Sequence, residues 1–360
     1  MKGNLNEKNL FLKLCAFENV NKAEVEELLE SGCLSEEVLG TLFVNRMAPV
    51  AYGVLQKEGL TDKLSREFRN SLRDAKMIAE QRTQSFIKCI EIVTNALEQA
   101  NANYALLKGA YLCSVYPLGY RTSNDIDVLV LPENVTKISN ALKDAGFEQG
   151  SIRNGEFVPA TRKEIIESKM MRGETVPFIK QVDMPFMKHL EVDINFSLDY
   201  KNSDEKTLAK MLERADLIST EFGKIRTLDR YDFLIHLCMH LYKEATTLPW
   251  IKMKRDMTLY KYMDIYYLFK RLSVTDEEEL IARAAEYGVE NELLYCIKSV
   301  SALFPVKRQI LLEYLNLHDS EELDYVVAPM EKKIYMYAES DPAKRFFDQD
   351  RSKLLVEVRK

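Results

Sequence analysis

The chain has 360 residues, of which 46% are hydrophobic and 29% charged, and its formal net charge is −6. This composition is ordinary for a soluble protein with room for two or three domains, and the small number of prolines and glycines (10 and 13) favours long helices over a loop-rich β protein. The acidic balance argues against a protein that follows a long nucleic-acid backbone, because neutralising phosphates requires clustered Lys and Arg.

The cysteines and the N-terminus both predict a cytoplasmic protein. The six cysteines are scattered and form no C-x-x-C pair, which is typical of reduced, structural thiols. The N-terminal run MKGNLNEKNLFLKLCAF has no apolar signal-peptide core. The most apolar window, residues 233–241, is too short to cross a membrane. We therefore expect a cytoplasmic protein without a membrane partner.

Residues 1–100 show helical apolar spacing, so we predict a helical N-terminal region. A long polar helical pattern runs from Thr61 to Ala100. One stripe of this pattern carries Ile78, Phe86, Ile90, Val93 and Leu97. Such a stripe indicates the face that packs on the rest of the protein.

At Asn103 the pattern changes to alternating strand and helix signals. We predict strands over residues 104–107, 125–130, 178–184 and 188–196. We predict helices over residues 108–116, 132–145 and 161–171, the second of which ends before Gly146. This alternation defines a core region over residues 101–200.

After Tyr200 we predict only helices, which form a C-terminal helical domain over residues 201–330. The predicted helices cover residues 204–214, 229–245, 255–272, 276–287, 290–304 and 307–315. The tail over residues 331–360 is charged and weakly patterned, so we assign it no elements.

Two acidic residues open the predicted strand over residues 125–130. Side chains two positions apart on a strand point to the same face, so Asp125 and Asp127 converge while Ile126, Val128 and Val130 face the core. Convergent carboxylates at a strand start suit a hard cation such as Mg²⁺, which takes oxygen ligands and retains room for a substrate's phosphates. The pair therefore predicts chemistry on a nucleotide.

A third carboxylate comes from the strand over residues 188–196. Apolar residues there alternate with Glu191, Asp193 and Asn195, which share the polar face. Either acidic residue is a candidate third ligand. We prefer Asp193, because it lies deeper in the apolar alternation.

Three such carboxylates suit nucleotidyl transfer. Two of them bridge a pair of metal ions that stabilise the entering and leaving oxygens, and the third helps on the acceptor side, where it can also act as general base. The Lys108–Gly109 turn lies between a predicted strand and a predicted helix, where backbone N–H groups can cradle phosphate. Arg121 and Ser123, beside the Asp pair, are predicted to contact the triphosphate.

The run LLKGAYL…YPLGYRTSNDIDVLV, together with the later HLEVDINFSL, resembles the nucleotidyltransferase superfamily that includes DNA polymerase beta and the antibiotic-modifying nucleotidyltransferases. More narrowly, the chain is similar to the uncharacterised bacterial nucleotidyltransferase family 5 group. That group has a Leu-Lys-Gly strand and turn, an Arg before Asp-x-Asp, and a helical C-terminal part with a His-rich helix, here around His236 and His240. The resemblance is loose over residues 20–275 and good over residues 104–131 and 188–197.

This resemblance implies an α+β fold, with a small mixed sheet flanked by N-terminal and C-terminal helical regions. It implies Mg²⁺ or Mn²⁺ on Asp125, Asp127 and Asp193, and a phosphate turn at Lys108 and Gly109. The superfamily usually has Ser after the glycine of that turn, whereas this chain has Ala110. The hydroxyl or cation that contacts phosphate must then come from another residue.

The leading hypothesis is transfer of a nucleoside monophosphate from an NTP, most simply ATP, to a hydroxyl of a small molecule, peptide or protein, with release of pyrophosphate. Two alternatives remain open. One is a glycosyltransferase that uses D-x-D to hold Mn²⁺ on a nucleotide sugar, although such enzymes have a longer βαβ region before that motif. The other, kept open by Ala110, is a degenerate nucleotide-binding module, such as one half of a toxin–antitoxin pair.

Overall fold

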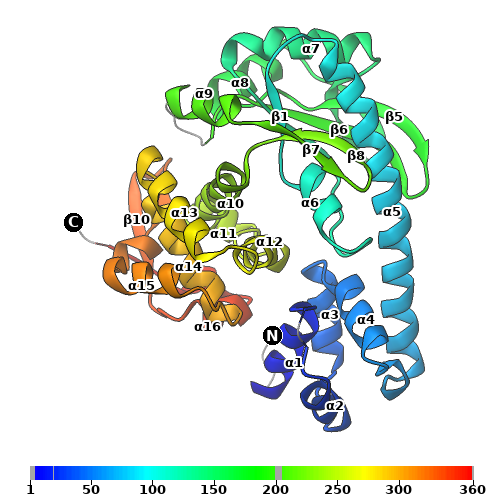
Figure 1. Ribbon diagram of the computed structural model, residues 1–360, viewed down its shortest axis with the longest axis vertical. Helices are drawn as coiled ribbons and strands as arrows, with labels where there is room; N and C mark the ends of the chain where they lie inside the picture. Colours follow the sequence, from blue (N-terminus) through cyan, green and yellow to red (C-terminus); the bar gives the residue numbers. More distant parts are fainter. Residues whose placement is uncertain (1–4, 19, 199–204, 359–360) are drawn as a thin grey trace. The chain divides into compact units, whose positions relative to one another are not determined.

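The computed structural model describes residues 5–18, 20–198 and 205–358, and it divides into two compact units (Figure 1). The core unit is Met77–Phe233. The helical unit combines Met1–Lys76 with Leu234–Lys360. Helices from both ends of the chain thus belong to one unit. The predicted boundary between residues 200 and 201 and the predicted start of a helix at residue 204 lie outside the described residues.

The core unit contains an eight-stranded sheet in the order β4-β3-β5-β6-β2-β1-β8-β7. Its strands are β1 (Tyr104–Leu106), β2 (Asp125–Val130), β3 (Glu148–Arg153), β4 (Glu156–Pro159), β5 (Phe178–Met184), β6 (Met187–Asn195), β7 (Asp216–Thr220) and β8 (Gly223–Thr227). Strand β2 runs parallel to β6 and antiparallel to β1, while β1 runs parallel to β8. The fold is therefore α+β with a mixed sheet and flanking helices, as predicted.

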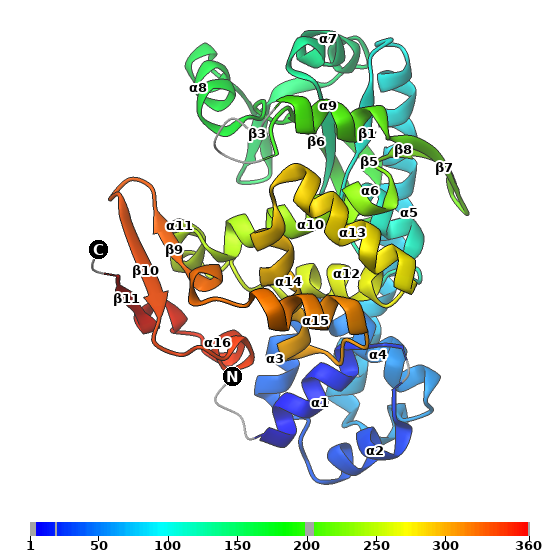
Figure 2. The same cartoon turned by 60° about the vertical axis from the view of Figure 1, so that its left-hand side comes forward.

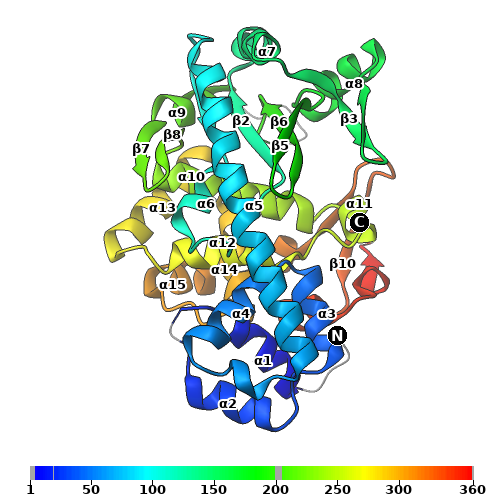
Figure 3. The same ribbon diagram turned by 90° about the vertical axis from the view of Figure 1, so that its right-hand side faces the viewer.

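One face of this sheet is covered by helices. The helices of this region are α5 (Arg66–Glu98), α6 (Gly109–Val115), η2 (Pro132–Asn134), α7 (Val135–Asp144), α8 (Arg162–Arg172) and α9 (Glu205–Glu213). Ile126, Val128 and Val130 of β2 pack with residues of α5 and α7 in one apolar cluster (Figure 3). Full burial of each such side chain contributes about 1.5–3 kcal/mol. The opposite face carries Asp125 and Asp127 on β2 and Glu191, Asp193 and Asn195 on β6, with the buried Leu129 next to Asp127 on that face of β2.

The predicted strands at residues 104–107, 125–130, 178–184 and 188–196 are confirmed, but two hairpins were not predicted. The prediction of only helices after Tyr200 is wrong for residues 216–227, which form the hairpin of β7 and β8. Its sequence carries little apolar alternation, and its stabilising contacts come from far along the chain. Thr227 lies opposite Leu106 and donates its hydroxyl to that carbonyl at 2.6 Å. The other hairpin, of β3 and β4, also lacks an alternation of apolar and polar residues, because its only buried residue is Gly150.

The helical unit begins with α1 (Leu5–Cys15), α2 (Lys22–Glu30), α3 (Glu36–Val44), α4 (Ala48–Lys57) and η1 (Thr61–Lys63). It continues with α10 (Arg230–Ala245), α11 (Leu248–Lys252), α12 (Leu259–Phe269), α13 (Val274–Tyr287), α14 (Glu290–Leu303) and α15 (Gln309–His318). Five of the predicted C-terminal helices therefore occur close to their predicted positions. The sixth, α9, belongs to the core unit.

The C-terminal segment forms elements that we did not predict. They are η3 (Glu321–Asp324), β9 (Val326–Ala328), β10 (Lys333–Tyr337), α16 (Pro342–Phe347), η4 (Arg351–Leu354) and β11 (Leu355–Glu357). The prediction of only helices up to residue 330 is therefore also wrong at β9, whereas the elements from β10 onward lie in the tail that we left unassigned. The three strands form a small antiparallel sheet beside α11 (Figure 2). Leu248 and Ile251 of α11 pack against Val326, Ala328 and Tyr337. The sheet depends on this long-range packing, which a local pattern does not reveal.

Among the described helices, none is by itself long and apolar enough to cross a membrane. The pair α3 and α4 meets that test only together, and the two helices are bent by 117° at the break between them. All six cysteines are buried.

Candidate active site

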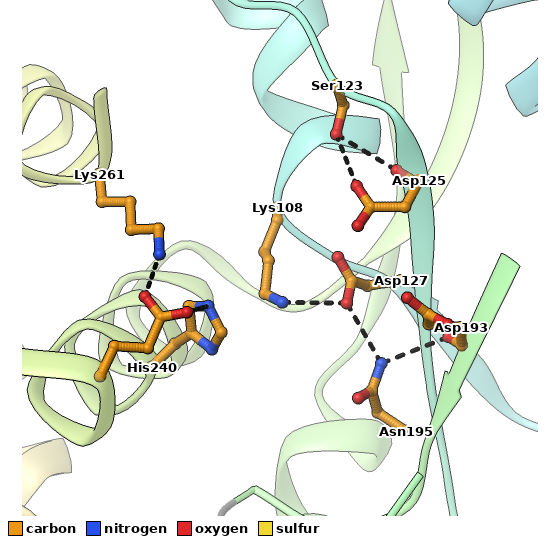
Figure 4. Close-up of polar contacts among 9 residues, drawn as sticks. Lys108, Ser123, Asp125, Asp127, Asp193, Asn195, His240 and Lys261 are labelled. Atoms are coloured by element: carbon orange, nitrogen blue, oxygen red, sulfur yellow. Dashed lines mark hydrogen bonds and ion pairs between the residues drawn. The ribbon is translucent and has the colours of Figure 1, made fainter. Parts of the chain in front are cut away.

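Four acidic side chains form a row on the polar face of β2 and β6. The parallel register of these strands places Asp125 opposite Glu191 and Asp127 opposite Asp193. Alternation sends the apolar residues between them to the helix-covered face. Figure 4 shows Asp125, Asp127 and Asp193 side by side. We call Asp125, Asp127, Glu191 and Asp193 the carboxylate row.

Negative charge is concentrated along this row. Burial raises the pKa of Asp193 well above its ordinary value, and repulsion from Asp127, Asp125 and Glu191 adds to the shift. Burial and repulsion from Asp125 and Asp127 also raise the pKa of Glu191. Both β6 carboxylates therefore belong to the same electrostatic cluster, and the preference for Asp193 as third ligand stays a prediction.

Two side chains donate hydrogen bonds to the same carboxylate oxygen of Asp127. Lys108 Nζ lies 2.9 Å from Asp127 Oδ1, and the Asn195 amide donates to that oxygen at 3.3 Å (Figure 4). Asn195 also donates to the Asp193 carbonyl at 3.3 Å. We predicted that Asn195 lies on the polar face but assigned it no role. Its position two residues after Asp193, on the same face of the strand, is the sequence signal that could have placed it in the site.

The Lys108–Gly109 turn packs directly against Ser123. A Cβ atom at Gly109 would lie 2.4 Å from both Cβ and Oγ of Ser123, so only glycine fits here without displacement. Ser123 Oγ in turn donates to Asp125, at 3.1 Å to Oδ1 and 3.2 Å to the carbonyl oxygen. The turn thereby supports the position of Asp125 through Ser123.

We expect Gly109→Ala to destabilise the protein by about 1–3 kcal/mol, which is typical of overpacking, and to weaken nucleotide transfer because Ser123 is pushed away from Asp125. The matched control is Gly40→Ala in α3, where a Cβ would meet nothing within 4 Å and where alanine is the better helix former. Urea unfolding and transfer rates measure both effects. Equal stability of the two variants would contradict the packing argument.

The remaining predicted phosphate contacts differ in their surroundings. Arg121 is buried, its Nη1 donates to the Thr122 carbonyl at 2.5 Å, and its own carbonyl accepts from the Cys113 thiol at 3.1 Å. Ala110 is fully buried in the apolar cluster, and its N–H donates to Leu107. Residue 110 therefore offers no side-chain contact to phosphate, and the prediction that Lys108, Arg121, Thr122 or Ser123 makes this contact stays open.

The donor set of the row fits a hard divalent cation, because it consists of carboxylate oxygens. As the described side chains lie, no group of three or more His, Cys, Asp or Glu residues could hold a metal ion. Magnesium sites that act on nucleotides commonly use one or two carboxylates and take further ligands from the substrate's phosphates. The row fits that kind of site, and the assignment of Asp125, Asp127 and Asp193 as ligands stays a prediction.

The comparisons with known proteins place the chain in a family. The model of a family described as uncharacterised nucleotidyltransferases matches residues 35–305, which is well over half of the chain. The chain belongs to this nucleotidyltransferase family, as the sequence resemblance predicted. A solved structure, an antigenic nucleotidyltransferase-like protein from Paracoccidioides brasiliensis, is 15% identical and covers 62% of this chain and 93% of its own, with a TM-score of 0.35. No curated protein gave a significant match.

A separate polar cluster lies within the helical unit, on α10 and α12. Glu244 is buried, pairs with Lys261, and lies 3.4 Å from His240 Nε2. Burial is the largest influence on Glu244 and disfavours its charged form. The attraction of His240 and Lys261 together outweighs burial and lowers the pKa of Glu244 to about 2.

This pairing predicts an acid-sensitive contribution to stability. A carboxyl whose pKa is depressed on folding stabilises the protein above the unfolded pKa and loses this effect as the pH falls through the folded pKa. We expect Glu244→Gln to cost about 3 kcal/mol at pH 7, and the difference from wild type to vanish between about pH 5 and pH 2. Urea unfolding of both proteins across this range measures the effect. A difference that does not change with pH would contradict the ion-pair explanation.

Proposed function

We propose that the chain is a metal-dependent nucleotidyltransferase that moves a nucleoside monophosphate from an NTP to an acceptor hydroxyl. The observation that carries the proposal is the register of β2 and β6, which gathers four carboxylates beside Lys108. Family membership supports the class of transferase. The expected cofactor is Mg²⁺ or Mn²⁺, and ATP is the expected nucleotide. We also propose a cytoplasmic location, from the sequence alone.

The reaction is an in-line displacement at the α-phosphorus. The acceptor oxygen forms a bond to the α-phosphorus, the bond from that phosphorus to the bridging oxygen breaks, and pyrophosphate leaves with the bonding electron pair. The acceptor proton passes to a base, for which Asp193 and Glu191 are the candidates. A bound divalent cation supplies neutralisation of the charge on the entering and leaving oxygens.

The chain's own residues have distinct parts in this scheme. Asp125 and Asp127 would hold the cation with Asp193 as the expected third ligand, and Ser123 and Asn195 would orient Asp125 and Asp127 through the hydrogen bonds described above. Lys108 is the cation that we expect to contact the triphosphate, together with Arg121 and Ser123. The acceptor is a hydroxyl of a metabolite, peptide or protein, because the acidic chain is poorly suited to a long nucleic acid.

The test is calorimetric binding of the four NTPs and of UDP-glucose, with and without Mg²⁺ or Mn²⁺. Binding is compared between the wild type, Asp125→Asn/Asp127→Asn, and the matched control Asp144→Asn/Asp183→Asn, in which both residues are exposed. We expect metal-dependent NTP binding that is lost only in the first double variant. Preferential binding of UDP-glucose would favour the glycosyltransferase alternative. Nucleotide binding with no turnover on any acceptor would favour the degenerate module.

A further inference from the structure

The ion pair between Lys108 and Asp127 occupies an atom that a metal ion would use. The two side chains are 23% and 9% exposed, and the ammonium lies on Asp127 Oδ1. Asn195 donates to the same oxygen. Figure 4 shows the other Asp127 oxygen on the side of Asp125, while Lys108 and Asn195 both contact the first oxygen. The pair can therefore act in two ways, by orienting Asp127 for a metal or by competing with the metal.

Charge decides between these two roles. The neutral amide of Asn195 already orients Asp127 through the shared oxygen, so orientation does not need a cation. A full positive charge 2.9 Å from a ligand oxygen repels a divalent ion at that carboxylate. The carboxylate row also needs a compensating charge in the metal-free protein, and the ammonium of Lys108 provides it at Asp127. Competition is the role that fits these contacts.

The backbone of Lys108 is held in a conformation that few non-glycine residues adopt, with φ of 44° and ψ of −117°. Strained positions of this kind persist only where the surroundings fix them, and they are common at functional sites. Here Gly109 lies against Ser123, and the Leu107 N–H donates to the Asp127 carbonyl at 2.9 Å. The stem of Lys108 is therefore fixed while its partly exposed ammonium remains able to change partner.

We propose that Lys108 is a stand-in cation that occupies Asp127 in the metal-free protein and transfers to the triphosphate when the metal and nucleotide bind. The inference rests on the proposed function and adds a coupling to it. A metal ion alone must displace Lys108 from Asp127, whereas a metal ion with a nucleotide offers Lys108 a new anionic partner. Metal and nucleotide therefore bind with positive coupling, which is reciprocal by linkage.

The test is a titration of the intact protein with Mn²⁺ alone, in which electron paramagnetic resonance measures the concentration of the free ion. Lys108→Met removes the charge, and Lys108→Gly also removes the strain at positive φ, so at least one variant remains folded. The matched control is Lys180→Met, a partly buried lysine of β5 that bonds the Ala145 carbonyl and lies over the Phe147 ring. We expect both Lys108 variants to bind Mn²⁺ about tenfold more tightly than wild type, or about 1.4 kcal/mol, and the control to be unchanged.

A repeat with α,β-methylene-ATP completes the test, because Lys108 then contributes to nucleotide binding. The advantage of the Lys108 variants should disappear or reverse in its presence. Unchanged or weaker Mn²⁺ binding by both variants without nucleotide would overturn the competition, and it would leave the proposed function intact if wild type binds Mn²⁺ with the analogue. Absence of Mn²⁺ binding in every protein, with and without the analogue, would overturn the proposed function as well.

Discussion

Asp127→Asn is expected to reduce the proposed nucleotide transfer by about 10³-fold or more, because it would remove a proposed metal ligand from the carboxylate row. Asp127 lies opposite Asp193 and accepts hydrogen bonds from Lys108 and Asn195. The measurement is the rate of pyrophosphate release with NTP and acceptor at saturating Mg²⁺.

The stability of this variant separates a functional role from a structural one. Removing the charge of Asp127 relieves repulsion that raises the pKa of Asp193, and Lys108 is exposed enough to be solvated. We therefore expect the free energy of unfolding to stay within about 1 kcal/mol of wild type or to increase, as is common when active-site charges are removed. The control is Asp183→Asn on β5, which should leave activity unchanged. A large loss of stability together with activity would indicate a structural role for Asp127.

The second large effect is expected at Asp256, which is fully buried in the helical unit. Arg351 donates two hydrogen bonds to Asp256, from Nε to Oδ2 at 2.7 Å and from Nη2 to Oδ1 at 2.6 Å. Arg351 is itself only 7% exposed. Removal of one partner leaves the other charge buried and unpaired, so Asp256→Ala should destabilise the protein by about 3–5 kcal/mol. Chemical unfolding of the full chain measures the loss.

Two further variants test whether the uncompensated charge is the cause. The exposed pair between Lys333 and Glu357 lies in the same C-terminal segment, and Glu357→Gln should cost about 0–1 kcal/mol. The double variant Asp256→Leu/Arg351→Met removes both charges and should recover most of the lost stability. If the double variant were as unstable as Asp256→Ala, the loss would come from packing rather than from the charge.

The sequence was sufficient to predict an element and its buried face where the local pattern of apolar residues matches the burial in the structure. Strand β2 begins at Asp125 and ends at Val130 as predicted, and Ile126, Val128 and Val130 are fully buried in the core as its alternation indicates, although Leu129 on the other face is buried as well. On α5, Phe86, Val93 and Leu97 are fully buried as the stripe predicted. Ile78 is 40% exposed, since the helix extends beyond the apolar cluster of the core unit at that end.

The missed features depend on contacts between distant segments. Strand β8 is stabilised by pairing with β1, about 120 residues earlier, and Arg351 pairs with Asp256, which lies 95 residues earlier in the sequence. No local period encodes either contact. Within the site, the row of carboxylates could be predicted from alternation. The contacts of Lys108 and Asn195 with one oxygen of Asp127 could not, because they depend on the pairing of β2 with β1 on one side and with β6 on the other.

The order of the two units along the chain has a consequence for synthesis of the protein. The core unit is continuous in sequence, whereas the helical unit joins residues from both ends. During translation the first 76 residues emerge early, yet most of their unit is translated only after residue 233. Because domains generally fold as units, we expect the core unit to become resistant to protease on the ribosome while α1–α4 are still cleaved. Stalled nascent chains of increasing length, treated briefly with protease, would reveal this order, and early protection of α1–α4 would contradict it.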